Sequence, residues 1–144
     1  ALQPEFKIYA SQVVSNAQTL ARTLQNRGYT IFTGGTDCHL LLVDLRSQNL
    51  TGKAAEHSLE NAGLTCNKNS IPFDTQTPFI TSGIRLGTPA GTSRGFGNAE
   101  FEIIGGLIAD VLDGLAQNPE NNSAAEKKAA LLVRDMCSRF PIYS

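Results

Sequence analysis

The stretch HLLLVDL, from His39 to Leu45, decides the fold of this chain. Its unbroken aliphatic run is typical of a strand buried on both faces, which lies centrally in a sheet covered by helices. Tyr29 to Thr33 is β-branched and aromatic and predicts a neighbouring strand, with Gly34-Gly35 turning the chain between them. Gly83 to Gly87 predicts another strand. We therefore expect an α/β fold in which helices cover a small sheet of about three main strands.

A long amphipathic helix precedes this sheet. Gly28 stands where a glycine commonly ends a helix. The helix begins almost at residue 1, so we expect the chain to be cut from a longer polypeptide. Its apolar residues recur every three or four positions, at Phe6, Ala10, Val13, Ala17, Leu20 or Ala21, and Leu24.

The segment after the central strand predicts a shorter helix from Gly52 to Ala62, closed by Gly63. Leu64 to Cys66 then predicts a short strand. Residues 67–81 contain two prolines and several turn-forming residues, so we expect an ordered loop there.

Two further helices are predicted after the Gly83 to Gly87 strand. Asn98 to Leu115 has apolar residues on one face and is broken by the sequence NPENN. Ser123-Ala-Ala-Glu126 matches a capping box, which predicts a last helix through Met136.

Composition limits the classes of partner. With 144 residues, 41% of them hydrophobic, the chain is long enough for one domain with its own core. The net charge is −1 and no basic block is present, which argues against a nucleic-acid partner. No apolar run reaches the roughly 20 residues of a membrane helix, and the N-terminus lacks the apolar core of a signal peptide.

The cysteines, Cys38, Cys66 and Cys137, are three in number and widely spaced. This spacing argues against a disulfide framework and indicates a reducing cytoplasm. Cys38 and His39 are adjacent, but no second pair stands at a suitable spacing, so we expect no metal site.

Arg85 is the strongest candidate for a binding residue, because it lies among apolar and small residues in the sequence SGIRLG. A guanidinium binds a carboxylate through two parallel hydrogen bonds. Gly83 and Gly87 would let a ligand approach the backbone closely. The alternative is a structural arginine that pairs with a neighbouring aspartate or binds a helix end. The glycines match neither GxGxxG nor GK[ST], so a phosphate loop is the weaker interpretation.

Other candidates are weaker. Arg94 could be a second anion contact, or a solvated arginine beside a helix start. Asp37 and His39 could share one face of a strand and do acid–base work, or could be a turn cap and a core histidine. His57 is expected on a helix surface. No Ser-His-Asp or Cys-His set emerges, so we expect no catalytic residue in this chain.

Together these segments resemble the C-terminal part of serine hydroxymethyltransferase, a pyridoxal-phosphate enzyme of fold type I. The likeness covers essentially the whole chain, in order and with matching gaps. Its residues are Gly34-Gly35-Thr36-Asp37, His39-Leu40, Val43-Asp44-Leu45, Thr51-Gly52-Lys53, Glu56, Asn67-Lys68-Asn69, Thr81 to Ala90 (TSGIRLGTPA), Arg94-Gly95-Phe96 and Phe140-Pro141-Ile142-Tyr143.

The resemblance implies roles for three residues. In this family the arginine matching Arg85 binds the α-carboxylate of serine or glycine, which orients the bond to be broken relative to the cofactor ring. The asparagine matching Asn69 belongs to the tetrahydrofolate site. Arg94 matches a second arginine near that site, with a supporting role. The family transfers the hydroxymethyl carbon of serine to tetrahydrofolate, giving glycine and 5,10-methylenetetrahydrofolate.

The chain also departs from the family. Cys38 stands where the family often has asparagine. The segment that carries the lysine for pyridoxal phosphate is missing, as are the residues contributed by a second subunit of the expected homodimer. None of the lysines here stands in the required context; they are at positions 7, 53, 68, 127 and 128. We expect residues 1–144 to be one C-terminal domain, inactive alone, in which helix 1–28 links the α/β part, 29–144, to a missing large domain.

Two alternatives remain beside the enzyme domain. One is a free-standing binding module that kept the carboxylate site without the chemistry. The other is a related enzyme such as a threonine aldolase, against which the folate-type NKN segment argues. Without its large domain, the chain should expose apolar surface around Val13, Val14 and Leu20 and associate weakly with itself.

Overall fold

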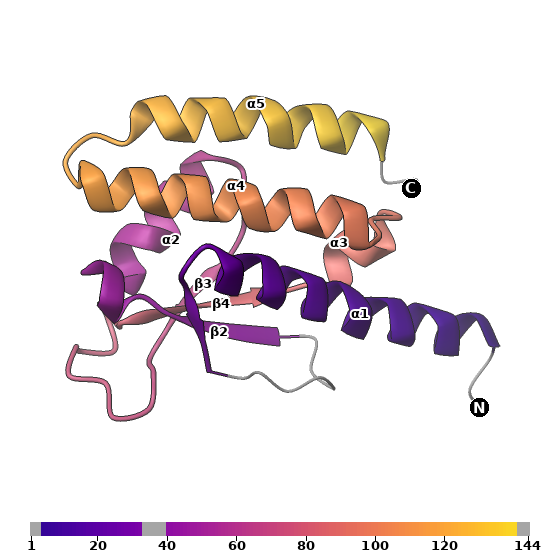
Figure 1. Cartoon of the computed structure of the whole chain (residues 1–144), viewed down its shortest axis with the longest axis horizontal. Coiled ribbons are helices and arrows are strands. Elements are labelled where there is room, and N and C mark those ends of the chain that lie inside the picture. Colours follow the sequence, from indigo (N-terminus) through magenta and orange to yellow (C-terminus); the bar gives the residue numbers. More distant parts are fainter. Residues whose placement is uncertain (1–3, 33–39, 141–144) are drawn as a thin grey trace.

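The computed structural model describes residues 4–32 and 40–140, which form one antiparallel sheet with helices packed against it (Figure 1). The helices are α1 (Pro4–Asn26), α2 (Gly52–Asn61), α3 (Pro89–Ser93), α4 (Asn98–Gln117) and α5 (Ser123–Arg139), with a 3-10 turn η1 (Arg46–Gln48). The strands are β1 (Thr30–Ile31), β2 (Leu40–Asp44), β3 (Asn67–Asn69) and β4 (Gly83–Gly87). The α/β class predicted from the sequence is confirmed.

The sheet has the strand order β1-β2-β4-β3, so the two five-residue strands lie in the middle. β2 pairs with β4 along its full length, from Leu40 opposite Gly87 to Asp44 opposite Gly83. The short strands β1 and β3 flank this pair. The chain must therefore travel from β2 through α2 and β3 before it returns to β4.

Alternation along β2 shows which face of the sheet the helices cover. Leu41 and Val43 are fully buried, whereas Leu40 and Leu42, on the other face, are only half-buried. In Figure 1 the helices lie on one side of the sheet. The predicted burial of HLLLVDL on both faces is thus right for one face and too strong for the other.

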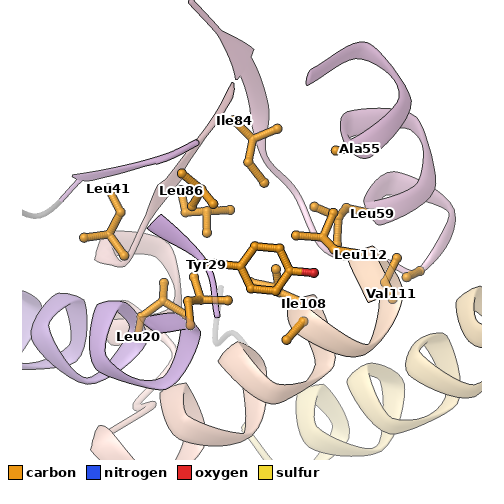
Figure 2. Packing of buried hydrophobic residues seen from close by; sticks show 14 of the residues in the cluster. Leu20, Tyr29, Leu41, Ala55, Leu59, Ile84, Leu86, Ile108, Val111 and Leu112 are labelled. Atoms are coloured by element: carbon orange, nitrogen blue, oxygen red, sulfur yellow. The ribbon is translucent and has the colours of Figure 1, made fainter. Parts of the chain in front are cut away.

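The core lies between the sheet and helices α1, α2 and α4 (Figure 2). Leu20 of α1 and Ile108 of α4 point into it together with Ile84 of β4. Val13 and Leu20 are 6% and 1% exposed, so the prediction that they form apolar surface is wrong. They pack inward because the apolar stripe of α1 faces the interior of this domain.

Two helices end just before a glycine, as predicted from the sequence. Gly28 follows α1 with φ +94°, and Gly63 follows α2 with φ +81°, the left-handed conformation that glycine adopts without strain. The predicted strand at 64–66 is wrong, because pairing begins at Asn67 and ends at Asn69. Asparagine is a poor strand former, and the partner strand β4 overrides this local preference.

The last helix begins differently from the prediction. Ser123 is its first helical residue and Asn122 the N-cap, without a side-chain capping bond. The Glu126 carboxylate instead accepts hydrogen bonds from Ser58 Oγ and Asn61 Nδ2 of α2. The capping-box prediction is therefore wrong, because a tertiary contact uses the carboxylate. The short helix α3 was not predicted.

Candidate ligand-binding site

The face of the sheet opposite the helices carries the two best candidates from the sequence. Residues directly opposite each other in neighbouring antiparallel strands project to the same face. Arg85 lies opposite Leu42 of β2 and Asn67 of β3, and Asn69 lies opposite Gly83. Arg85, Asn67 and Asn69 therefore share the open face of the sheet. We call these three residues the polar face.

Arg85 is exposed and has no carboxylate partner among residues 4–32 and 40–140. Several other arginines do pair with aspartates: Arg27 with Asp110 and Asp113, Arg46 with Asp44, and Arg139 with Asp135. The interpretation of Arg85 as a structural ion-pair residue thus finds no support in the described chain. Its guanidinium remains available to an anion from outside the domain.

Asn69 is half-buried, and its Nδ2 donates a hydrogen bond to the Ser70 carbonyl at 2.9 Å. Its Oδ1 receives no hydrogen bond from the described residues. Because Asn69 pairs with Gly83, it is the diagonal neighbour of Arg85, and such neighbours lie about 7–8 Å apart. An amide and a guanidinium at this spacing can contact two parts of one ligand, or two adjacent ligands.

Gly83 has a different role from the one predicted. A Cβ atom here would lie 2.8 Å from Ile71 Cγ2 and 2.9 Å from the Val43 carbonyl oxygen. The missing side chain therefore makes room for Ile71 rather than for a ligand. The side chain of Ile71 is accordingly only 4% exposed.

Glu56 of α2 holds β3 in place, a contact that the sequence did not indicate. Its Oε2 accepts a hydrogen bond of 2.8 Å from the backbone N–H of Lys68, the residue before Asn69. Strand β3 is thereby attached on one side to β4 and on the other to α2.

Asp74 is a second residue that sequence reasoning missed. Its carboxylate accepts hydrogen bonds from the N–H groups of Ile71, Gln76 and Ser82 and from Ser82 Oγ. Burial pushes the pKa of Asp74 upward, but these hydrogen bonds outweigh it and lower the pKa to about 2. The one local signal was the aspartate two residues before Gln76, in a sequence rich in turn formers.

Arg94 lies apart from the polar face. Its Nη2 donates to the Cys137 carbonyl, 3.4 Å away in the last turns of α5, and its Nε is buried without a hydrogen-bond partner among the described residues. The supporting role implied for Arg94 stays a prediction.

The remaining candidates do not join the polar face either. His57 is exposed on α2, as predicted, with its Nε2 3.4 Å from Asn61 Nδ2. Asp37, Cys38 and His39 lie outside the described residues. Burial raises the pKa of Cys66 to about 12, and nearby Glu56 and Glu60 add to this shift, so its thiol stays protonated.

The described part of the chain contains neither a cluster of metal ligands nor a membrane-spanning helix. In residues 4–32 and 40–140, no three histidine, cysteine, aspartate or glutamate side chains come together as metal ligands would. None of the helices described there combines the length and apolar character needed to cross a bilayer.

The described residues form a small α/β domain whose open sheet face carries Arg85, Asn67 and Asn69. The chain belongs to the serine hydroxymethyltransferase family, whose family profile matches residues 1–108. This confirms the resemblance inferred from the sequence motifs.

Curated relatives support the same family. Serine hydroxymethyltransferase of Paramagnetospirillum magneticum is 67% identical over 143 residues, which cover 99% of this chain and 34% of that protein. Serine hydroxymethyltransferase 3 of Colwellia psychrerythraea is 64% identical over 143 residues, 99% of this chain and 33% of that protein. Serine hydroxymethyltransferase of a Marinomonas species is 59% identical over 143 residues, which cover 99% of this chain and 34% of that protein. The chain thus spans about a third of the length of these relatives.

Proposed function

We propose that this chain is the C-terminal domain of a serine hydroxymethyltransferase and supplies its site for the substrate carboxylate. The whole protein would transfer the hydroxymethyl carbon of serine to tetrahydrofolate, giving glycine and 5,10-methylenetetrahydrofolate. The observation that carries this proposal is Arg85, an exposed guanidinium on the polar face without a carboxylate partner in the described chain. A fork of this kind grips a carboxylate in one orientation and so restricts how the amino acid can rotate.

Asn69 would form part of the tetrahydrofolate site. Its amide can both donate and accept hydrogen bonds, as the edge of a pterin ring requires. In the structure its Oδ1 has no donor among the described residues, and its position diagonal to Arg85 would bring folate beside the amino acid. The amino acid and the carbon acceptor would then meet over β3 and β4.

Pyridoxal phosphate does not fit the residues of this chain on their own. Its lysine must form a Schiff base inside a pocket. Here Lys7, Lys53, Lys127 and Lys128 are exposed, and Lys68 lies on β3, opposite Ile84 and thus off the polar face. We therefore assign the cofactor to the rest of the polypeptide, which α1 would join to residues 29–144. Homodimeric assembly and a cytoplasmic location are further parts of this proposal.

The test is the Arg85→Lys substitution in the full-length protein. Lysine keeps the charge but loses the two-pronged hydrogen bond, which costs about 1.5–3 kcal/mol, or roughly 10–150-fold in kcat/KM for serine. Binding of pyridoxal phosphate, followed by its absorbance, should remain unchanged, because Arg85 does not contact it in this proposal.

Arg22→Lys is the matched control, since Arg22 is an exposed arginine on α1, away from the polar face. It should leave both measurements at the wild-type value. Unchanged serine turnover in the Arg85→Lys variant would show that the carboxylate is bound elsewhere.

A further inference from the structure

The loop between β3 and β4 is closed on itself by a single carboxylate. Asp74 accepts hydrogen bonds from the N–H groups of Ile71 at 3.2 Å, Gln76 at 2.9 Å and Ser82 at 2.8 Å, and from Ser82 Oγ at 2.7 Å. Ile71 and Ser82 stand at opposite ends of this loop. The side chain of Asp74 therefore links the two ends of the loop.

Those ends adjoin the two proposed ligand-binding residues. Ile71 follows Asn69 by two residues, and Ser82 precedes Arg85 by three. Ile71 also occupies the space left by the missing side chain of Gly83, with its Cγ2 2.8 Å from where a Cβ would lie. A change in the position of the loop end would be transmitted directly to both strands.

The loop is held in a conformation that it would not adopt freely. Phe73 and Thr81 have φ values of +58°, in the left-handed region that side chains with a Cβ rarely occupy. Thr81 Oγ1 donates to the Gly83 carbonyl at 3.0 Å, and the Thr81 carbonyl accepts from the Gly52 N–H of α2. A strained backbone of this kind persists only where surrounding contacts hold it in place. Within the loop, Asp74 makes the largest number of side-chain hydrogen bonds.

We propose that Asp74 is a positioning residue that fixes Asn69 and Arg85 relative to each other, so that the amino acid and tetrahydrofolate are held in one geometry. This inference rests on the proposed function of the two residues. Asp74 touches neither ligand and acts through the backbone of β3 and β4. Its loss should therefore weaken both ligands together, whereas a change in Arg85 weakens the amino acid alone.

The charge state of Asp74 suits this role. Its pKa lies near 2, below the ordinary carboxyl value, so the ionised form is the one that the folded loop prefers. The stability that ionised Asp74 gives the folded protein is complete at pH values above the ordinary carboxyl pKa. It is lost as the pH falls toward 2. Asp44 and Arg46 interact electrostatically with Asp74 and pair with each other at 2.9 Å. Asp74 thus stays ionised throughout the neutral range.

The test is Asp74→Asn in the full-length protein, with the KM for serine measured kinetically and the Kd of tetrahydrofolate measured by equilibrium dialysis. We expect both constants to rise about tenfold, because a small misplacement of positioned groups is costly, while kcat changes less. Hydrogen exchange of the Ile71, Gln76 and Ser82 amides should become faster. Asp135→Asn, an exposed aspartate on α5, is the control and should alter none of these values.

Ser82→Ala is the second variant, for the case that Asp74→Asn does not fold. It removes only one of the hydrogen bonds to Asp74 and should therefore keep the fold. It should raise the same two constants by a smaller factor. Faster amide exchange with both constants unchanged, or a rise in only one constant, would overturn the positioning role. If the wild-type protein binds neither serine nor tetrahydrofolate, the proposed function itself fails, and this inference fails with it.

Discussion

Gly83 shows how one missing side chain shapes the surface around Arg85. It stands two residues before Arg85 in β4, opposite Asp44 and Asn69, and the side chain of Ile71 fills the space beside it. Arg85 itself projects from the open face of the sheet, where water or a ligand can reach it. The residue proposed to bind the carboxylate and the residue that packs are thus separated by one position on the same strand.

Gly83→Ala should lower the free energy of unfolding by about 1–3 kcal/mol, because the new methyl group meets Ile71 and the Val43 carbonyl. Urea unfolding followed by circular dichroism measures this change. Gly106→Ala is the control: it lies in α4 with no atom within 4 Å of the added Cβ, so it should stabilise the helix by up to about 1 kcal/mol. Equal stability of the two variants would contradict the packing role of Gly83.

At the scale of elements, a partly buried polar cluster attaches α5 to α2 and α4. Ser58 Oγ of α2 donates to Glu126 Oε2 at 2.5 Å and accepts from Asn122 Nδ2 at 2.9 Å. Asn122 Nδ2 also donates to the Val111 carbonyl of α4. Ser58 is 2% exposed, so its hydroxyl has few alternative hydrogen-bond partners if one of these is lost.

Ser58→Ala should destabilise the chain by about 1–3 kcal/mol, the cost of leaving buried hydrogen-bonding groups without their partner. Thermal unfolding gives the change as a lower Tm. Ser11→Ala, at an exposed position on α1, is the matched control and should stay within about 0.5 kcal/mol of wild type. A Tm for Ser58→Ala equal to that of the control would mean that α5 is held by its apolar contacts alone.

At the scale of the whole molecule, one face of the sheet is covered and the other is left open in the described chain. Several large apolar side chains are exposed as well; they are Ile8, Phe32, Phe73, Phe79, Ile103, Leu131 and Leu132. This surface differs from the one predicted around Val13 and Leu20. Weak self-association of the isolated chain stays a prediction, and Phe73 and Phe79 are the most exposed of these side chains, at 98% and 80%.

The isolated chain should bind serine and glycine too weakly to measure. An exposed ion pair, such as Arg85 would form with a bound amino acid, is worth about 0–1 kcal/mol, whereas a Kd of 1 mM requires about 4 kcal/mol. Calorimetric titration up to millimolar amino acid should therefore give no saturable heat. The full-length protein, titrated in parallel, should bind. Micromolar binding by the chain alone would instead favour a free-standing binding module.

Much of the fold followed from the sequence because hydrophobic periodicity and glycines act locally. The helices at Gly52 and Asn98 and the strands around Val43 and Ile84 were predicted near their observed positions. The errors came from contacts between distant segments. β3 exists because β4 and Glu56 pair with it, and Glu126 reaches α2 instead of capping α5.

The candidate site likewise contains residues that a local sequence pattern indicates and residues that only distant contacts bring together. Arg85 was singled out from its neighbours alone, because an arginine amid apolar and small residues needs a partner. That Asn69 shares its face depends on the register of β3 with β4, which no local pattern contains. Asp74 was missed for a similar reason, since its partners at Ile71 and Ser82 become neighbours only when the loop closes.

The lengths of the outer strands bear on how the chain avoids aggregation. A sheet edge with unpaired N–H and C=O groups is a template for strand addition by another molecule. Here β1 has two residues and β3 three, and the N–H of Lys68 in β3 is already bound by Glu56. Within residues 4–32 and 40–140, neither outer strand forms a ladder long enough to recruit a foreign strand. The described edge strands therefore give little opportunity for fibril growth, even though one face of the sheet is open in this part of the chain.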